Sequence, residues 1–172
     1  QGSVLSARKL TIVHAPHLNG AWLRDFRTAM TGPYAGPPKR KIFVSRKAAR
    51  SRHLDNESAV WSMLERDGFE LVVLEELSFA EQVELFSQAL VIVSLHGAGL
   101  ANIVFSAASA HIVEIIDPGF PNPEYYELAS VLGHGYWLVS GTPTGAGKPG
   151  SRDLSVDVDE LRLVIDQVDQ HI

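Results

Sequence analysis

Apolar and polar positions follow two different periods along this chain, and segments of the two kinds alternate. Short, nearly continuous apolar runs are typical of buried strands, whereas apolar residues repeated every three or four positions are typical of helices. Strands are predicted over residues 10–14, 41–45, 70–74, 90–95, 111–116 and 136–139. Helices are predicted over residues 20–31, 56–67, 78–89, 99–107, 123–132 and 157–170. This alternation predicts βαβ units, and therefore an α/β fold whose parallel sheet is covered by helices on both faces.

Several of the predicted helix ends carry specific capping residues. Ser78 and Glu81 have the spacing of a capping box, in which the serine accepts from the third helical N–H and the glutamate reaches back. Asp157 occupies an equivalent position before the last predicted helix. Asn122 precedes a proline and is predicted to cap the helix that Gly133 closes. These residues define the limits of three helices independently of the apolar period.

The composition is that of one globular domain. Of 172 residues, 45% are hydrophobic and 20% are charged, which is enough to build a sizeable core. Gln1-Gly2-Ser3 has the form of a cleaved expression tag, so the domain is expected to span residues 4–172, with a flexible loop at 141–150. No apolar run approaches the roughly 20 residues needed to cross a bilayer, so no membrane segment is expected. Cysteine is absent, which excludes disulfides and thiolate chemistry.

Positive charge is concentrated in one segment. The net charge is −5, yet residues 39–53 hold seven of the fifteen Lys and Arg residues and no acidic residue. A basic segment in an acidic chain favours a local anionic ligand over a long polyanion, so no nucleic-acid partner is expected. Within the segment, Arg50 and Arg52 are interpreted as residues of a solvated loop.

The strongest candidate for chemistry is a glycine turn between a predicted strand and a predicted helix. Residues 91–102 read Val-Ile-Val-Ser-Leu-His-Gly-Ala-Gly-Leu-Ala-Asn. Such a turn presents backbone N–H groups and the positive end of a helix dipole at the carboxyl edge of the sheet, where open α/β sheets bind ligands. Gly97 and Gly99 lack Cβ, so the chain can turn sharply and a phosphate can approach the backbone.

Four interpretations of this turn compete. A dinucleotide fingerprint would need a third glycine where Asn102 stands. A hydrolase oxyanion loop would need a Gly-x-Ser-x-Gly elbow, which the chain does not contain. Glycines can also serve tight packing alone. A diphosphate-binding turn without redox chemistry fits best.

Three polar residues near strand ends join the turn as candidates. Arg46 ends a predicted strand, so its guanidinium should emerge at the same edge, with donors matched to phosphate oxygens. Glu114 interrupts an apolar strand, and a buried carboxylate needs partners; ribose hydroxyls or an ion pair with Arg46 would both serve. His96 is interpreted as a ligand contact or as a core histidine. No cluster has metal-ligand spacing, so no metal site is expected.

These residues, in this order, resemble the family 61 glycosyltransferases over roughly residues 20 to 170. That family includes bacterial capsular-polysaccharide enzymes, plant xylosyl- and arabinosyltransferases, and animal protein O-GlcNAc transferases of the secretory pathway. The matching segments are Lys41-Ile42-Phe43-Val44-Ser45-Arg46, Asn56-Glu57, Gly68-Phe69-Glu70, Leu77-Ser78-Phe79-Ala80-Glu81-Gln82-Val83, His96-Gly97-Ala98-Gly99-Leu100-Ala101-Asn102 and Val113-Glu114-Ile115.

The resemblance implies a fold, a role and a set of ligand contacts. The fold is one Rossmann-like half of a GT-B glycosyltransferase, namely its C-terminal domain that binds the nucleotide-sugar donor, with a UDP-sugar favoured. Transfer would be inverting and would need neither a cofactor nor a metal. The diphosphate contacts implied are Arg46, His96, Gly97, Ala98, Gly99, Leu100 and Asn102. The contacts implied for base, ribose or sugar are Leu74, Glu75, Glu76, Leu77 and Glu114.

The resemblance leaves other aspects of function open. The acceptor is expected to be a saccharide or glycoprotein, held by an N-terminal acceptor domain that is missing here, so the isolated chain is expected to be inactive. No residue is identified as the catalytic base. A bacterial cytoplasmic location is favoured over the Golgi or reticulum lumen. Two other functions are possible from the sequence: a non-catalytic saccharide- or nucleotide-binding module, and an NAD-dependent oxidoreductase domain.

Overall fold

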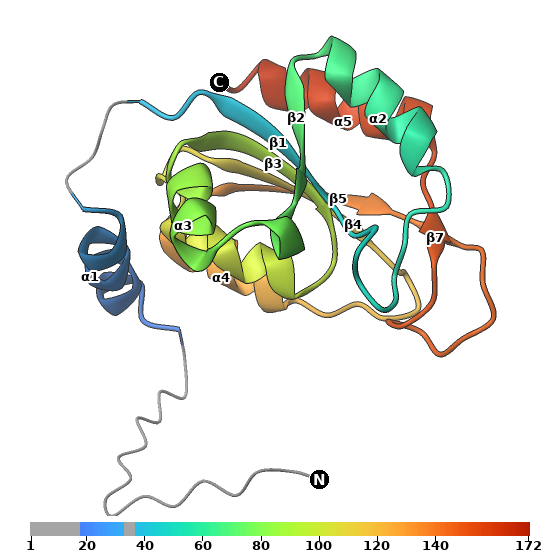
Figure 1. Cartoon of the computed structure of the whole chain (residues 1–172), viewed down its shortest axis with the longest axis horizontal. Helices are drawn as coiled ribbons and strands as arrows, with labels where there is room; N and C mark the ends of the chain where they lie inside the picture. Colours follow the sequence, from blue (N-terminus) through green and yellow to red (C-terminus); the bar gives the residue numbers. More distant parts are fainter. Residues whose placement is uncertain (1–17, 33–36) are drawn as a thin grey trace, which may run out of the picture.

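A computed structural model describes residues 18–32 and 37–172 (Figure 1). The predicted strand at 10–14 lies outside the described residues. Along the chain the helices and strands are α1 (Gly20–Thr31), β1 (Arg40–Ser45), α2 (Glu57–Arg66), β2 (Phe69–Val73), η1 (Leu74–Glu76), α3 (Phe79–Ser87), β3 (Ala89–Leu95), η2 (Ala98–Phe105), β4 (His111–Ile116), α4 (Glu124–Leu132), β5 (Gly135–Ser140), β6 (Thr142–Pro143), β7 (Leu154–Ser155) and α5 (Val158–Asp169).

The centre of the fold is a five-stranded sheet in the order β2-β1-β3-β4-β5. Every neighbouring pair in it is parallel. The chain moves outward from β1 to β2 in one direction and from β3 through β4 to β5 in the other. The order therefore reverses between β1 and β3, and the carboxyl ends of these two strands form the topological switch point. The predicted Rossmann-like α/β fold is confirmed.

Helices cover both faces of the sheet, and each face has its own core. One core unites the sheet with α1, α3, η2 and α4, and the other unites it with α2 and α5. Figure 1 shows α2 and α5 together on one side of the strands, with α3 and α4 on the other. Successive β1 residues alternate between the two: Ile42 and Val44 join the first core, and Phe43 joins the second. All three are buried, which explains why the strand is apolar without interruption.

The capping predictions for Ser78, Asp157 and Gly133 are confirmed, whereas the one for Asn122 is wrong, because Pro123 occupies the N-cap position of α4. Ser78 accepts from the N–H of Glu81, whose carboxylate accepts from the N–H of Ser78, as a capping box requires. Asp157 caps α5, and Gly133 ends α4 at a φ of 79°, in the left-handed region that favours glycine. The α4 helix begins at Glu124, one residue later than predicted. Asn122 accepts from the N–H of Glu124 and so forms the turn before the helix.

Two segments differ from their predicted structure. Residues 99–107 were expected to form an α-helix, but the chain winds as the 3-10 helix η2 over residues 98–105. Its fully buried residues Leu100 and Ile103, with Ser106 just beyond it, lie three positions apart, which matches three residues per turn. The expected loop 141–150 contains β6, which pairs antiparallel with β7; two-residue strands are too short to give a period.

Candidate functional site

A cleft lies at the switch point of the sheet, as expected for a ligand site in an open α/β fold. Its volume is about 280 Å³. It is lined by the ends of β1 and β3, by the turn after β2, by α3 and by the start of η2. The lining residues are Val44, Ser45, Arg46, Leu74, Glu75, Gln82, Ser94, Ala98, Gly99 and Asn102. Six of the twelve residues singled out from the sequence thus share one cleft, which we call the switch-point cleft.

The glycine turn borders this cleft with free amide groups. Within the described residues, the N–H groups of Gly97, Ala98 and Gly99 donate to no other group. The N–H of Leu100 donates to the carbonyl of Gly97 at 2.9 Å, and the Leu100 side chain is fully buried in the core. Leu100 therefore supports the turn from within. The amides of Ala98 and Gly99, which line the cleft, are open to an anionic ligand, whereas Gly97 is buried beneath Arg46.

The two glycines serve close packing more than an unusual backbone conformation. Gly97 has a φ of 166°, an extended value that any residue adopts. A Cβ atom there would lie 2.1 Å from Nη1 of Arg46, so the guanidinium lies directly over the Gly97 backbone. A Cβ atom on Gly99 would lie 2.9 Å from Cδ1 of Leu74. The absence of side chains here lets Arg46 and Leu74 pack onto the turn.

Arg46 is positioned by loop carbonyls and has no carboxylate partner in the part of the chain that the structure describes. Its Nε donates to the carbonyl of Arg52 at 3.2 Å, and its Nη2 donates to the carbonyl of Ser51 at 3.1 Å. Burial lowers the pKa of Arg46, and the positive charge of Arg52 lowers it further, partly opposed by Glu75. A partly buried guanidinium beside a second cation is a favourable site for an added anion.

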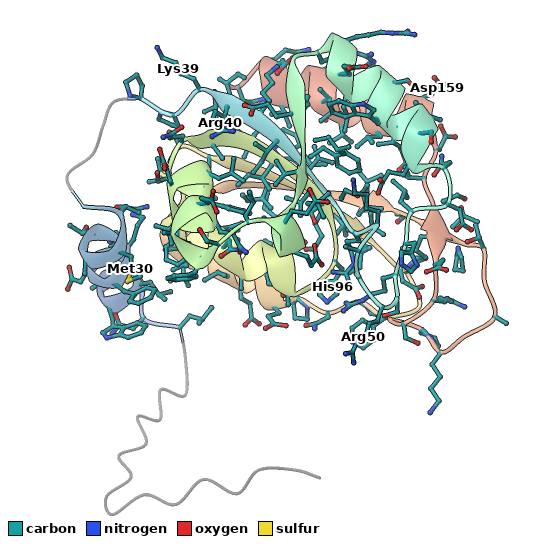
Figure 2. All side chains as sticks on the ribbon, viewed as in Figure 1. Met30, Lys39, Arg40, Arg50, His96 and Asp159 are labelled. Carbon is teal, nitrogen blue, oxygen red and sulfur yellow. The ribbon has the colours of Figure 1, made fainter. Side chains whose placement is uncertain are left out.

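Arg52 is a site residue that the sequence interpretation missed. Its φ of 62° places a non-glycine residue in the left-handed region, at a cost of roughly 1–2 kcal/mol. Its Nη1 donates to the carbonyl of His96 at 3.0 Å, and its buried Nε has no hydrogen-bond partner among the described residues. Arg50, by contrast, is exposed on the surface as expected (Figure 2). The basic segment was the available signal, but sequence alone does not separate these two arginines.

Glu114 and His96 form a buried pair below the turn. Glu114 has no exposed surface, and one carboxylate oxygen lies 2.5 Å from Nδ1 of His96. The other oxygen accepts from the hydroxyl of Tyr136. Burial and the adjacent carboxylate raise the pKa of Tyr136, so the phenol stays protonated and donates. Glu114 therefore has neither of the partners that the sequence left open: it does not pair with Arg46, and it presents no surface to a ribose.

Two aromatic rings surround the His96 imidazole. Tyr125 of α4 lies with its ring centroid 5.1 Å from that of His96, and Phe120 lies at 5.9 Å in an edge-on arrangement. Burial raises the pKa of Tyr125, while the charges of Arg52 and Arg46 oppose this increase. Tyr125 thus lies within the field of both arginines, and no sequence pattern indicated this position.

Of the remaining predicted residues, Asn102 lines the switch-point cleft and Leu77 packs against the core. Asn102 donates to the side-chain oxygen of Gln82 at 3.0 Å, and Gln82 donates to the carbonyls of Leu74 and Leu77. Gln82 thus ties η2 to the turn after β2.

The two glutamates of the η1 turn differ in their surroundings. Glu75 lines the switch-point cleft. The carboxylate of Glu76 lies 4.0 Å from the ammonium of Lys47, in an exposed pair. A pair of this kind contributes little to stability.

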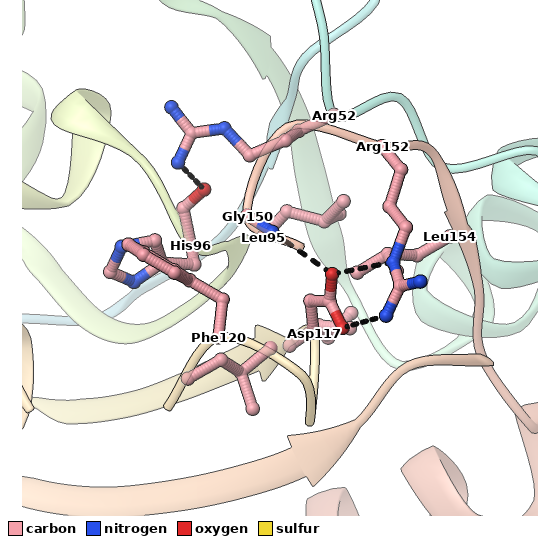
Figure 3. Close-up of a pocket in the computed structure, with 10 residues that line it drawn as sticks. Arg52, Leu95, His96, Asp117, Phe120, Gly150, Arg152 and Leu154 are labelled. Atoms are coloured by element: carbon pink, nitrogen blue, oxygen red, sulfur yellow. Dashed lines mark hydrogen bonds and ion pairs between the residues drawn. The ribbon is translucent and has the colours of Figure 1, made fainter. Parts of the chain in front are cut away.

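A carboxylate clamp holds the loops beside His96. Asp117 follows β4 and accepts from Nε and Nη2 of Arg152, both at 2.8 Å, and from the N–H of Gly150 (Figure 3). It also accepts from the N–H of Gly119. The clamp joins the loop that carries Phe120 to the loop before β7. The hydrogen bonds from Arg152 hold the pKa of Asp117 far below its ordinary value, with the two backbone N–H groups adding to the effect.

This clamp makes a pH-dependent contribution to stability. Because the pKa of Asp117 is depressed in the folded protein, its stabilisation is complete above about pH 5 and is lost progressively as the pH falls further. We expect the thermal unfolding midpoint to fall less steeply between pH 5 and pH 3 in Asp117→Asn than in the parent, measured by circular dichroism. Equal slopes in the two proteins would contradict the clamp.

The described residues contain neither a metal-binding cluster nor a membrane-spanning helix. In residues 18–32 and 37–172, no group of three or more His, Asp or Glu residues is arranged to hold a metal ion. No helix in the described part of the chain has the length and apolarity to cross a membrane.

The sequence matches one family model and is similar to a plant protein. The family model described as Glycosyltransferase 61 matches residues 4–113. The chain is also similar to alpha-1,3-arabinosyltransferase XAT2 of Oryza sativa subsp. japonica, with 33% identity over 100 residues. That match covers 56% of this chain and 16% of the rice protein, so the matched region is a small part of the relative's length.

Proposed function

Because this chain belongs to the glycosyltransferase 61 family, we propose that it is the donor-binding domain of an inverting glycosyltransferase that uses a UDP-sugar. The observation that carries the proposal is the pair Arg46 and Arg52, two guanidinium groups that have no carboxylate partner among the described residues and lie beside a turn with three free amides. A diphosphate supplies the two negative charges that this arrangement lacks.

The cleft suggests how the donor would lie. The base would rest against Leu74 and Glu75 at the β2 side, and the diphosphate would lie over Ala98 and Gly99, within reach of Arg46. The transferred sugar would then extend toward His96 on the β4 side. This order follows the direction from β2 across the switch point to β4.

The chemistry proposed for these groups is electrostatic. When the bond between the sugar and the diphosphate breaks, negative charge grows on the departing diphosphate. Arg46, Arg52 and the amides of the turn would stabilise that charge without reorganisation, since loop carbonyls already hold the two guanidiniums. Neither a metal ion nor a cofactor is needed for this step as proposed.

The acceptor side belongs to the proposal as well. The rice relative is named as an arabinosyltransferase, so a pentose donor and a saccharide or glycoprotein acceptor are the first candidates. In a GT-B enzyme the acceptor is held by a second, N-terminal domain. We therefore expect this chain to bind donor alone and to transfer sugar only when that domain is present.

Calorimetric titration with UDP in the presence of EDTA tests the proposed function directly. We expect UDP to bind at least tenfold more tightly than GDP or NAD, because the base would contact the closely packed turn after β2. Binding of NAD in preference to UDP would instead support an oxidoreductase domain. Absence of binding by all three nucleotides would favour a non-catalytic module.

A further inference from the structure

The side chain of His96 points away from the switch-point cleft. Its ring lies among Glu114 of β4, Phe120 of the following loop and Tyr125 of α4, on the opposite side of Gly97 from the turn after β2. Its carbonyl oxygen accepts from Arg52. The backbone of His96 thus contributes to the arginine site, while its imidazole, in a residue only 7% exposed, lies on the β4 side of the turn.

The buried carboxylate decides which nitrogen of His96 carries the proton. Glu114 is fully buried and accepts from Tyr136, so its remaining oxygen, 2.5 Å from Nδ1 of His96, needs a donor. Nδ1 must therefore carry a proton. In the neutral ring, Nε2 is then an acceptor with a lone pair. Among the described residues, no group donates to Nε2.

A hydrogen-bond acceptor suits a hydroxyl and not a phosphate. A neutral imidazole with its proton on Nδ1 has no N–H to offer to phosphate oxygens. The neighbouring Phe120 ring is 39% exposed, which provides an apolar surface for the C–H face of a sugar. The combination of an acceptor nitrogen and an accessible aromatic ring has the chemistry of a monosaccharide subsite.

We propose that Nε2 of His96 accepts a hydrogen bond from a hydroxyl of the transferred sugar, with Glu114 and Tyr136 as positioning residues that fix the imidazole tautomer. This inference rests on the donor-binding function proposed above. It changes the role of His96 from a diphosphate contact, as implied by the family resemblance, to a sugar contact. Glu114 then acts on the sugar through His96, which explains why it needs no exposed surface.

The tautomer is tested in the unaltered protein. Nitrogen-15 NMR of the imidazole at pH 8, assigned by the signal lost in His96→Gln, should show the proton of His96 on Nδ1 and the lone pair on Nε2. A proton on Nε2, or on both nitrogens at this pH, would overturn the inference. In Glu114→Gln, the new amide can donate to Nδ1, so the proton should shift toward Nε2. If Glu114 served packing alone, this substitution would leave the tautomer of His96 unchanged.

The sugar contact is tested by calorimetry with UDP against UDP-arabinose, UDP-xylose and UDP-N-acetylglucosamine. For the sugar that binds the parent best, His96→Gln should weaken binding roughly three- to tenfold, the range of one hydrogen bond, and leave UDP binding unchanged. The exposed His171 provides the control, and His171→Gln should bind all four ligands like the parent.

The outcomes separate this inference from the proposed function. Equal weakening of UDP and UDP-sugar in His96→Gln would make His96 a diphosphate contact, so the inference would fail while the donor site stands. Unchanged binding of every ligand would likewise overturn it. If the parent binds no UDP ligand at all, the proposed function itself fails.

Discussion

Arg46→Ala is expected to weaken UDP binding about 10- to 100-fold without unfolding the domain. The loss corresponds to one charge-assisted hydrogen bond to the diphosphate, which contributes about 1.5–3 kcal/mol. Stability should change little, because Arg46 donates to the carbonyls of Ser51 and Arg52 and no carboxylate in residues 18–32 and 37–172 pairs with it, so its removal leaves no described charge unpaired. Removal of one guanidinium also relieves its repulsion with Arg52. Calorimetry and thermal unfolding of the same sample measure both effects.

Arg52 permits a complementary experiment that separates binding from stability. Arg52→Gly removes the guanidinium and also the strain of a φ of 62°, which glycine adopts readily. We expect weaker UDP binding together with unchanged or increased stability. If Arg52 contributed only to folding, Arg52→Gly would instead lower the stability of the domain and leave its affinity for UDP unchanged.

The control for both variants is Arg50→Ala. Arg50 comes from the same basic segment but is exposed to solvent (Figure 2). It should change UDP affinity less than twofold at physiological salt, since exposed charges are screened over about 8 Å. If Arg50→Ala reduced affinity as much as Arg46→Ala, the basic segment would act as a diffuse patch. If Arg46→Ala bound UDP like the parent, the assigned site would be wrong.

Much of this fold could be predicted because its strands are buried on both faces. Continuous apolar runs located β1 to β5 within one or two residues, and the glycine turn after β3 placed the candidate site at the carboxyl edge. The winding of η2 could not be predicted, since apolar residues spaced three and four apart suit an α-helix and a 3-10 helix alike. Two-residue strands such as β6 have no detectable period.

The partners of charged residues were the least predictable feature of the site. Glu114 was recognised as a carboxylate that needs partners, but Tyr136 lies 22 positions further along and reaches it from the neighbouring strand. Tyr125 approaches the arginines only because α4 packs against η2. The strain at Arg52 is a property of backbone dihedral angles, which composition and spacing do not reveal. A residue whose role depends on a non-local contact has no local signal.

The role of the glycine turn illustrates the same limit and leads to a sharp experiment. The sequence explained Gly97 by turn geometry and phosphate approach, whereas its backbone is extended and a Cβ atom would collide with Arg46, 2.1 Å from Nη1 and 2.9 Å from Cζ. Since those atoms are the far end of a flexible side chain, Gly97→Ala should displace the guanidinium at little cost in stability. We expect UDP affinity to fall about tenfold or more, nearly as far as in Arg46→Ala.

A double-mutant cycle distinguishes this mechanism from a direct clash with the ligand. If Gly97→Ala acts by displacing Arg46, then adding it to Arg46→Ala should cost little more, and the coupling free energy should be about 1 kcal/mol or larger. Additive losses would show instead that the new methyl group blocks the phosphate itself. Gly135→Ala is the matched control, because its Cβ atom would lie 2.5 Å from the His111 ring at the opposite edge of the sheet. Gly135→Ala should displace the His111 side chain and leave UDP affinity unchanged. This result would show that a collision lowers UDP affinity only where it displaces Arg46.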